Sequence, residues 1–456
     1  MPFAVLSRRR STLPILLLPA LVACGSWSRV GTESAPSPAQ NFTSVLDETA
    51  VFRRIGRLAA GGQVPFVGNV ALLPGPGDST LALLALSLEN RALGFERSGT
   101  QGFAARYRVD ITFQREGAAP ITVGREETVR VTTFQETLRN DESVLFQEPV
   151  KLPPGRYHLT VAVRDRRGDR QSRAEQDVTA PAYVAGSTTA PILVYEVTGR
   201  GTPDDPFRGL LNPRGAAGYG ADTLIALVEG YRMTAGQRIP IRVVDAQDSV
   251  LLAQDLEFAG TSAVESRVLR FAPDRAPLGE LRFIVGADSA TARTTTALVS
   301  LSSNWIVSNY DEMVALLRYF GNEEQLARLR HAAPADRPGL WQAFYKDSDP
   351  NPATPENEAL DAYFLRLAGA DQRFPDEGQP GWRTERGEVY IVLGDPDEVI
   401  DASATNQGRV VRWTYTAYRV VLYFVDETGF GRFRLTPQSR ADFERVRARV
   451  ARAEHH

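Results

Sequence analysis

One cysteine, Cys24, is present in the whole chain of 456 residues, and this scarcity constrains the fold more than any other feature. A lone cysteine cannot close an internal disulfide, and it leaves no second thiolate for a metal site. Every hydrophobic core must therefore be held by packing and hydrogen bonds alone. The length of the chain is typical of two to four domains at about 100 to 200 residues each.

The sequence before Cys24 has the order of a secretion signal. Three arginines, Arg8–Arg10, precede an apolar run of 11 residues, Leu13–Ala23. A membrane-spanning helix needs about 20 apolar residues, so a cleaved signal peptide over residues 1–23 is favoured over a short membrane anchor. An ordinary secretion signal that ends near a cysteine by chance is the other alternative.

The end of this signal, Leu-Val-Ala-Cys, resembles the lipobox of bacterial lipoproteins. The resemblance implies that Cys24 becomes the lipidated first residue of the mature protein. The protein would then be anchored by its lipid in the cell envelope. Gly25, rather than an aspartate, follows the cysteine, which favours the outer membrane and a periplasmic orientation.

The charge and composition of the residues after the signal argue against a nucleic-acid partner and predict a flexible tether. Removal of the three arginines leaves 49 basic and 55 acidic residues, a net charge of −6. Nucleic-acid binding calls for a basic face or domain, so we expect no nucleic-acid partner. Residues 24–62 begin with a stretch rich in Ser, Pro, Gly and Ala, which predicts a flexible tether. A short amphipathic helix is expected within Val45–Leu58.

Two consecutive stretches, residues 63–185 and 186–302, have the short apolar segments and turn signals of β-strands. Strands are expected at 80–88, 105–113, 128–132 and 157–163 in the first stretch, and at 192–197, 223–229, 239–244, 263–271 and 281–285 in the second. This spacing predicts two tandem immunoglobulin-like β-sandwiches. Arg167-Gly168-Asp169 is interpreted as a hairpin turn rather than an adhesion motif.

From about residue 303 the apolar spacing changes from two residues to 3.6. Met313, Leu316, Leu317 and Phe320 share one helical face, and Gly321 follows as a stop signal. Further helices are expected at 323–332, at 338–345 and from 354 onward, and a polar helix or tail at 438–456. The fold class is therefore mainly β, with a C-terminal α+β domain at 303–437 that contains a helical segment and a small antiparallel sheet.

Metal and cofactor sites are not indicated. Asp347, Asp349, Asn351 and Glu358 have the spacing of a calcium loop, but that loop needs a glycine where this chain has Pro352. The same acids are explained as helix-start signals. His158 has no ligand at metal-binding spacing, and the chain has no phosphate-binding glycine loop or dinucleotide fingerprint. We expect no metal and no cofactor.

The most distinctive stretch is Pro380–Val399, PGWRTERGEVYIVLGDPDEV. It predicts a Gly-Trp turn leading into a strand, then a Gly-Asp-Pro-Asp turn, with an aromatic hairpin at 409–415 and 419–425. Together with the Asp349–Glu358 segment, it resembles the GWxTD-domain family across about residues 304–436. Glu385 stands where the family name has Asp. The resemblance implies an envelope or secreted protein and supplies no established reaction.

Two interpretations of this stretch are open. In the first, Trp382 is a structural plug and Glu385 pairs locally with Arg386. In the second, the stretch forms a binding groove, whose candidate residues are Trp382, Thr384, Glu385, Arg386, Asp395, Asp397 and Trp413.

Catalysis has weak support in the sequence. Histidines occur only at positions 158, 331, 455 and 456, and neither of the first two is near a nucleophile elbow. We therefore expect a non-catalytic binding or assembly component of an envelope or secretion-related complex, with an envelope protein or a glycan as partner. The alternative is a carboxylate-dependent hydrolase of an envelope glycan, with a pair such as Glu385 and Asp397.

Overall fold

The computed structural model describes residues 28–30, 48–99, 102–139, 142, 144–287, 291–301, 305–307, 309–321, 323–352, 357–374, 379–403 and 409–453. Cys24 and the rest of the predicted signal lie outside these residues. The chain divides into two compact units, Met1–Thr32 with Asp395–Val446, and Glu33–Gly394 with Arg447–His456. Among the described residues, no helix is both long and apolar enough to cross a bilayer. The domain boundaries proposed from the sequence stay predictions.

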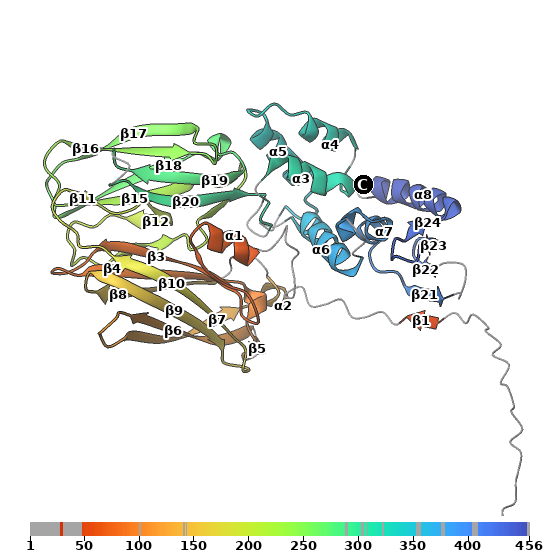
Figure 1. Ribbon diagram of the computed structural model, residues 1–456, viewed down its shortest axis with the longest axis horizontal. Coiled ribbons are helices and arrows are strands. Elements are labelled where there is room, and N and C mark those ends of the chain that lie inside the picture. Colours follow the sequence, from red (N-terminus) through yellow and green to blue (C-terminus); the bar gives the residue numbers. More distant parts are fainter. Residues whose placement is uncertain are drawn as a thin grey trace, which may run out of the picture. The chain divides into compact units, whose positions relative to one another are not determined.

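The first sandwich is built from two antiparallel sheets (Figure 1). One has the order β2 (Leu58–Ala60), β3 (Phe66–Pro74), β4 (Thr80–Leu88) and β8 (Val144–Leu152). The other has the order β10 (Gln171–Ala180), β9 (Gly155–Asp165), β6 (Phe103–Gln114) and β5 (Glu96–Arg97), with β7 (Ile121–Val131) also paired to β6. Side chains alternate along β6, so that Tyr107, Val109 and Ile111 enter the core between the sheets. The strands expected in this stretch are confirmed.

The second sandwich repeats this plan. One sheet has the order β11 (Ser187–Thr188), β15 (Leu224–Tyr231), β12 (Ile192–Thr198) and β13 (Arg208–Leu211), with β18 (Val264–Phe271) paired to β15. The other has the order β14 (Ala216–Gly218), β20 (Arg293–Ser300), β19 (Gly279–Val285), β16 (Gln237–Val244) and β17 (Val250–Phe258). The pairing of β14 with β20 is parallel. The chain is thus mainly β, with two immunoglobulin-like sandwiches.

Strand β4 is buried along its whole length, which explains why its sequence does not alternate. Leu84 and Leu86 face the core of the first sandwich. Leu81 and Leu83, on the opposite face of β4, pack into a second cluster with strands β12, β13 and β15 of the other sandwich. A strand covered on both faces needs apolar residues at every position. The two sandwiches therefore share an apolar interface through this sheet.

A buried ion pair reinforces the same junction. Arg200 contacts Glu229 through two hydrogen bonds, Nε to Oε1 at 3.0 Å and Nη2 to Oε2 at 2.6 Å. Both side chains are only 1% exposed. Arg200 Nη2 also donates to the carbonyl oxygen of Pro74, in the first sandwich, at 3.0 Å. Because a buried charge is costly without partners, this pair favours one arrangement of the two sandwiches.

Helices follow the sandwiches, and the first four of them lie in stretches where the apolar spacing predicts helices. They are α3 (Tyr310–Leu316), α4 (Glu323–Arg330), α5 (Arg337–Asp347), α6 (Glu358–Arg373) and α7 (Glu385–Leu393), with 3₁₀ turns η3 (Leu317–Tyr319) and η4 (Gly381–Arg383). Earlier in the chain, α1 (Glu48–Arg54) falls within the amphipathic segment and buries Phe52. The core of the helical segment is aromatic, with the rings of Trp305 and Phe364 stacked at 5.2 Å.

The C-terminal sheet has the order β1 (Ser28–Val30), β21 (Glu398–Ser403), β22 (Arg409–Tyr415), β23 (Val420–Asp426) and β24 (Arg434–Leu435), and α8 (Pro437–Ala453) follows it. The predicted aromatic hairpin is β22 and β23. Residues 28–30, expected in the flexible tether, instead pair with β21 as an edge strand. The unused hydrogen-bonding groups of a sheet edge favour such pairing.

Two expectations in the helical segment need correction. The strand predicted after the Gly-Trp turn is helix α7. Its Val-Tyr-Ile-Val run is typical of a strand by propensity, but Thr384 caps the helix start and Gly394, with φ of 79°, ends it. The fourth helix, expected from residue 354, is observed from Glu358 with Asn357 as its cap; residues 353–356 lie outside the described residues.

Candidate functional site

The Gly-Trp-Arg-Thr segment forms a 3₁₀ turn joined directly to a helix cap. Thr384 Oγ1 accepts a hydrogen bond from the Gly387 amide at 3.0 Å and donates one to the carbonyl oxygen of Gly381 at 2.7 Å. The side chain is only 3% exposed. One hydroxyl therefore joins η4 to the first turn of α7, and replacing it would leave a helix-start amide without its partner.

Two glycines allow η4 to lie against the backbones on either side. A Cβ on Gly381 would fall 2.7 Å from Asp371 Cα, near the end of α6. A Cβ on Gly387, in α7, would fall 2.9 Å from the carbonyl carbon of Gly381 and closer still to its oxygen. Neither distance leaves room for a side chain. The glycine of the motif is therefore explained by the close approach of three backbone segments.

Trp382 is buried, with 6% of its surface exposed. The guanidinium of Arg383 lies 4.6 Å from the centroid of its ring, which places a cation on the aromatic face. This geometry supports the interpretation of Trp382 as a structural plug. An exposed aromatic platform for a ligand would require a free ring face.

Glu385 and Arg386 are half-buried residues of the first turn of α7. Neighbouring residues of a helix do not face each other, so the expected local pair between them is not favoured by the helix. Glu385 is placed where a carboxylate stabilises a helix start. The Arg386 guanidinium lies 5.4 Å from the ring centroid of Phe374, just after α6.

The other three candidate groove residues belong to the compact unit that contains Asp395–Val446, whereas Trp382–Arg386 belong to the other unit. Asp395 and Asp397 are exposed residues of the turn before β21. Asp397 Oδ2 accepts a hydrogen bond from the Thr416 amide at 2.6 Å, so this carboxylate holds a turn of the sheet. Trp413 is 3% exposed, and its ring packs 4.7 Å from that of Phe424. Within its own unit, the Trp382–Arg386 segment forms one local site.

A hollow of about 420 Å³ lies beside Trp382 in the helical segment. We call it the arginine hollow; its lining residues are Asp311, Val314, Ala315, Arg318, Arg330, Trp382 and Arg383. The three arginines come from η3, the last residue of α4 and the last residue of η4. Sequence reasoning missed this cluster because the arginines are far apart in the chain. They meet only in the folded helical segment, where residues of α3, η3, α4 and η4 line the same hollow.

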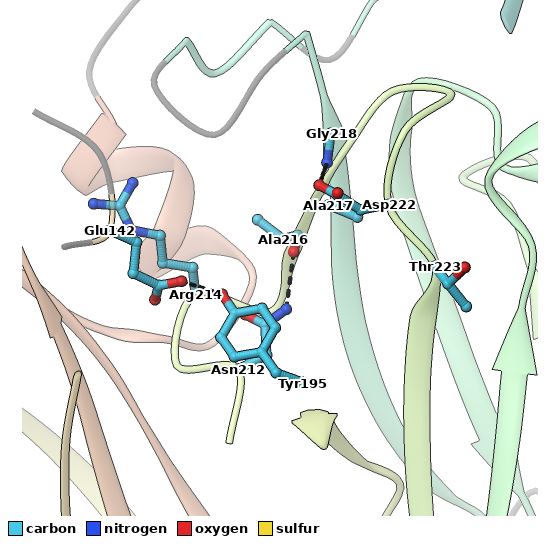
Figure 2. A pocket seen from close by; sticks show the side chains of 9 residues that line it. All are labelled: Glu142, Tyr195, Asn212, Arg214, Ala216, Ala217, Gly218, Asp222 and Thr223. Atoms are coloured by element: carbon cyan, nitrogen blue, oxygen red, sulfur yellow. Dashed lines mark hydrogen bonds between the residues drawn. The ribbon is translucent and has the colours of Figure 1, made fainter. Parts of the chain in front are cut away.

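A smaller hollow of about 220 Å³ is lined by residues of both sandwiches (Figure 2). Its polar groups bond to one another. The Tyr195 hydroxyl donates to Glu142, the Asn212 amide donates to the Ala216 carbonyl at 2.9 Å, and Asp222 accepts from the Gly218 amide at 2.7 Å. The Asn212 and Asp222 bonds are local bonds within turns, and the Tyr195 bond joins the two sandwiches, so we interpret this hollow as structural.

The remaining sequence candidates have local partners. His158 on β9 lies opposite Asp177 on β10, with Nδ1 3.0 Å from Oδ1. This hydrogen bond raises the pKa of His158 above its ordinary value. In the predicted calcium-like segment, Asp349 Oδ1 accepts from the Asn351 amide at 2.8 Å. Within the described ranges, no group of three or more His, Cys, Asp or Glu side chains is placed to hold a metal ion.

Comparison with known proteins finds a match to one protein family. Residues 282–430 match the GWxTD domain. No curated protein matches the sequence. Among solved structures, the chicken CNTN1 FN1–FN3 domains are 14% identical, with 51% of this chain and 65% of that chain covered and a TM-score of 0.15. The BSP domain of a biofilm associated protein is 8% identical, with 56% and 54% covered and a TM-score of 0.15.

The chain spans 65% and 54% of the lengths of these two solved structures. Their TM-scores are too low to carry an argument.

Proposed function

Since this chain is a GWxTD domain-containing protein, we propose that it is a lipid-anchored, non-catalytic binding or assembly component of the bacterial cell envelope. The lipid on Cys24 would hold it in the outer membrane, facing the periplasm. Its partner would be another envelope protein or a glycan. The hydrolase stays the alternative.

The structural role of the Gly-Trp-Arg-Thr segment carries this proposal. A catalytic group must touch its substrate, yet Trp382 and Thr384 are buried. Both hydrogen bonds of the Thr384 hydroxyl stay within η4 and α7. The segment therefore has a structural role, in which it connects η4 to α7. We infer that binding takes place on the surface of the helical segment around it.

Anchoring is tested by replacing the cysteine. Cys24→Ser should appear in the soluble fraction or accumulate as an unprocessed precursor, because lipidation needs the thiol. Ser26→Ala is the matched control and should stay with the membranes. A fully processed Cys24→Ser protein that still sediments with membranes would contradict the anchoring proposal.

The choice between binding and hydrolysis is tested by Glu385→Gln in the full-length protein. A binding component should retain its cellular effect, its partner recovered by cross-linking, and its melting temperature, because the amide keeps the shape of the side chain. An acid, base or nucleophile needs the ionisable group itself. Loss of the cellular effect with partner recovery and melting temperature unchanged would favour the hydrolase.

A further inference from the structure

We propose that the arginine hollow binds a phosphate group, carried either by a soluble phosphate ester or by a lipid headgroup. This inference rests on the proposed binding function and names a ligand chemistry for it. The hollow is lined by Arg318, Arg330 and Arg383, with Asp311 as its single lining acid. The full chain has a net charge of −3, so this concentration of positive charge runs against its overall balance.

Two of the three arginines are available to a ligand. Among the described residues, neither Arg318 nor Arg383 forms an ion pair, and both are exposed. Arg330 contacts Glu323 at 3.1 Å, but 46% of its side chain remains exposed. An unneutralised guanidinium beside a hollow favours an anion, and its planar array of donors matches the oxygens of phosphate.

Aromatic contacts hold these two guanidinium groups without neutralising them. Arg383 lies 4.6 Å from the ring centroid of Trp382, and Arg318 lies 5.1 Å from that of Tyr319. A cation held over a ring keeps its charge and loses fewer rotamers on binding. Trp382, itself held by the close packing of η4, therefore positions Arg383 toward the ligand. This gives the tryptophan of the motif a positioning role in addition to its role in the core.

The size and lining of the hollow indicate that the phosphate is part of a larger molecule. A volume of about 420 Å³ falls in the usual range of small-ligand sites, about 300 to 1,000 Å³. Val314 and Ala315 supply apolar surface, and the Asp311 carboxylate can accept a hydrogen bond from a hydroxyl. A phosphate ester with an adjoining hydroxyl group fits this combination.

The test is calorimetric titration of the purified full-length protein with two probes. Pyrophosphate represents soluble phosphates, and dihexanoyl phosphatidylglycerol below its micelle concentration represents lipid headgroups. Arg318→Gln and Arg383→Gln should each weaken binding about tenfold, the effect of losing one charge-assisted hydrogen bond. The matched control is Arg328→Gln, because Arg328 lies on α4, pairs with Glu324 and does not line the hollow.

Tighter binding of phosphatidylglycerol, with the same losses in the variants, would identify a lipid headgroup, and tighter binding of pyrophosphate a soluble ester. Failure of both probes to bind would overturn the inference, as would an equal loss in Arg328→Gln. If Arg383→Gln also lowers the melting temperature, its weaker binding could come from lost stability, and the test then rests on the binding affinity of Arg318→Gln. Failure of the proposed function is distinguishable, because loss of anchoring or of a partner would leave phosphate binding unchanged.

Discussion

Replacing Gly387 by alanine should destabilise the helical segment, although alanine favours helices. In an open helix interior, glycine to alanine stabilises by about 0.5 to 1 kcal/mol. At Gly387 the new Cβ would fall 2.9 Å from the carbonyl carbon of Gly381 and 3.1 Å from Trp382 Cα, whereas ordinary contacts are 3.4 Å or longer. Both neighbours are backbone atoms, so rotation of a side chain cannot relieve the overlap.

The magnitude follows from two terms. Overpacking a tight contact costs about 1 to 3 kcal/mol, or more where backbone must move. Moving η4 away from α7 also weakens the Thr384 cap, which contributes about 1 kcal/mol. After subtraction of the gain in helix propensity, Gly387→Ala should lower the free energy of unfolding by roughly 1 to 3.5 kcal/mol.

The assay is native-state hydrogen exchange of the α6 and α7 amides, which reports the stability of this segment separately from that of the sandwiches. Gly339→Ala in α5 is the matched control, because nothing lies within 4 Å of the Cβ it would gain. It should be neutral or stabilise by up to about 1 kcal/mol. If Gly387→Ala slows exchange in α7 as much as Gly339→Ala does in α5, the explanation of the motif glycine by close backbone packing is wrong.

Three further predictions concern the core, the sandwich junction and pH. Trp382→Ala should lower the free energy of unfolding by about 3 to 5 kcal/mol in urea denaturation, the usual cost of truncating a buried tryptophan. Arg200→Met should cost about 3 to 5 kcal/mol in the same assay, because it leaves Glu229 buried without its cation. His158→Gln should remove a pH dependence of the melting temperature. Because Asp177 raises the folded-state pKa of His158 above 6.5, its contribution is fully present below about pH 6.5 and is lost as pH rises through the raised value.

Each of these predictions has a control or a contrary outcome. Arg238→Met removes the cation of a pair that is 65% and 62% exposed, and such pairs contribute about 0 to 1 kcal/mol. An equal loss at Arg200 and Arg238 would contradict the argument from burial. Trp382→Ala with wild-type stability would mean that the ring is a platform rather than a plug. An unchanged pH profile in His158→Gln would show that another group titrates there.

Strand positions in the sandwiches were predictable because the local pattern and the tertiary environment agree. In β6 every second residue is apolar and buried, so period two is visible in the sequence itself. The uniform apolar run of β4 was recognisable as a strand, but the sequence did not show why apolar and polar residues fail to alternate there. Only the packing of the second sandwich against Leu81 and Leu83 explains why the alternation is missing.

Helix α7 shows where local reasoning fails. Its Val-Tyr-Ile-Val run has strand propensity, and differences in propensity are below about 1 kcal/mol per residue. Burial of Val389, Ile391 and Leu393 inside the helical segment, together with the Thr384 cap, outweighs that preference. Thr384 and Gly394 are helix start and stop signals in the sequence. They are not sufficient to specify a helix until tertiary packing buries its apolar residues.

The sequence by itself determined the single-cysteine constraint, the order of sandwiches, helices and sheet, and the resemblance carried by the Gly-Trp-Arg-Thr segment. The tertiary structure alone decided what that segment does. Gly381 and Gly387 matter because of backbones that only folding brings within contact. Arg318, Arg330 and Arg383 form one hollow because separate helices converge there. Local periodicity is set by neighbours along the chain, whereas close backbone packing and converging charges depend on contacts between residues distant in sequence.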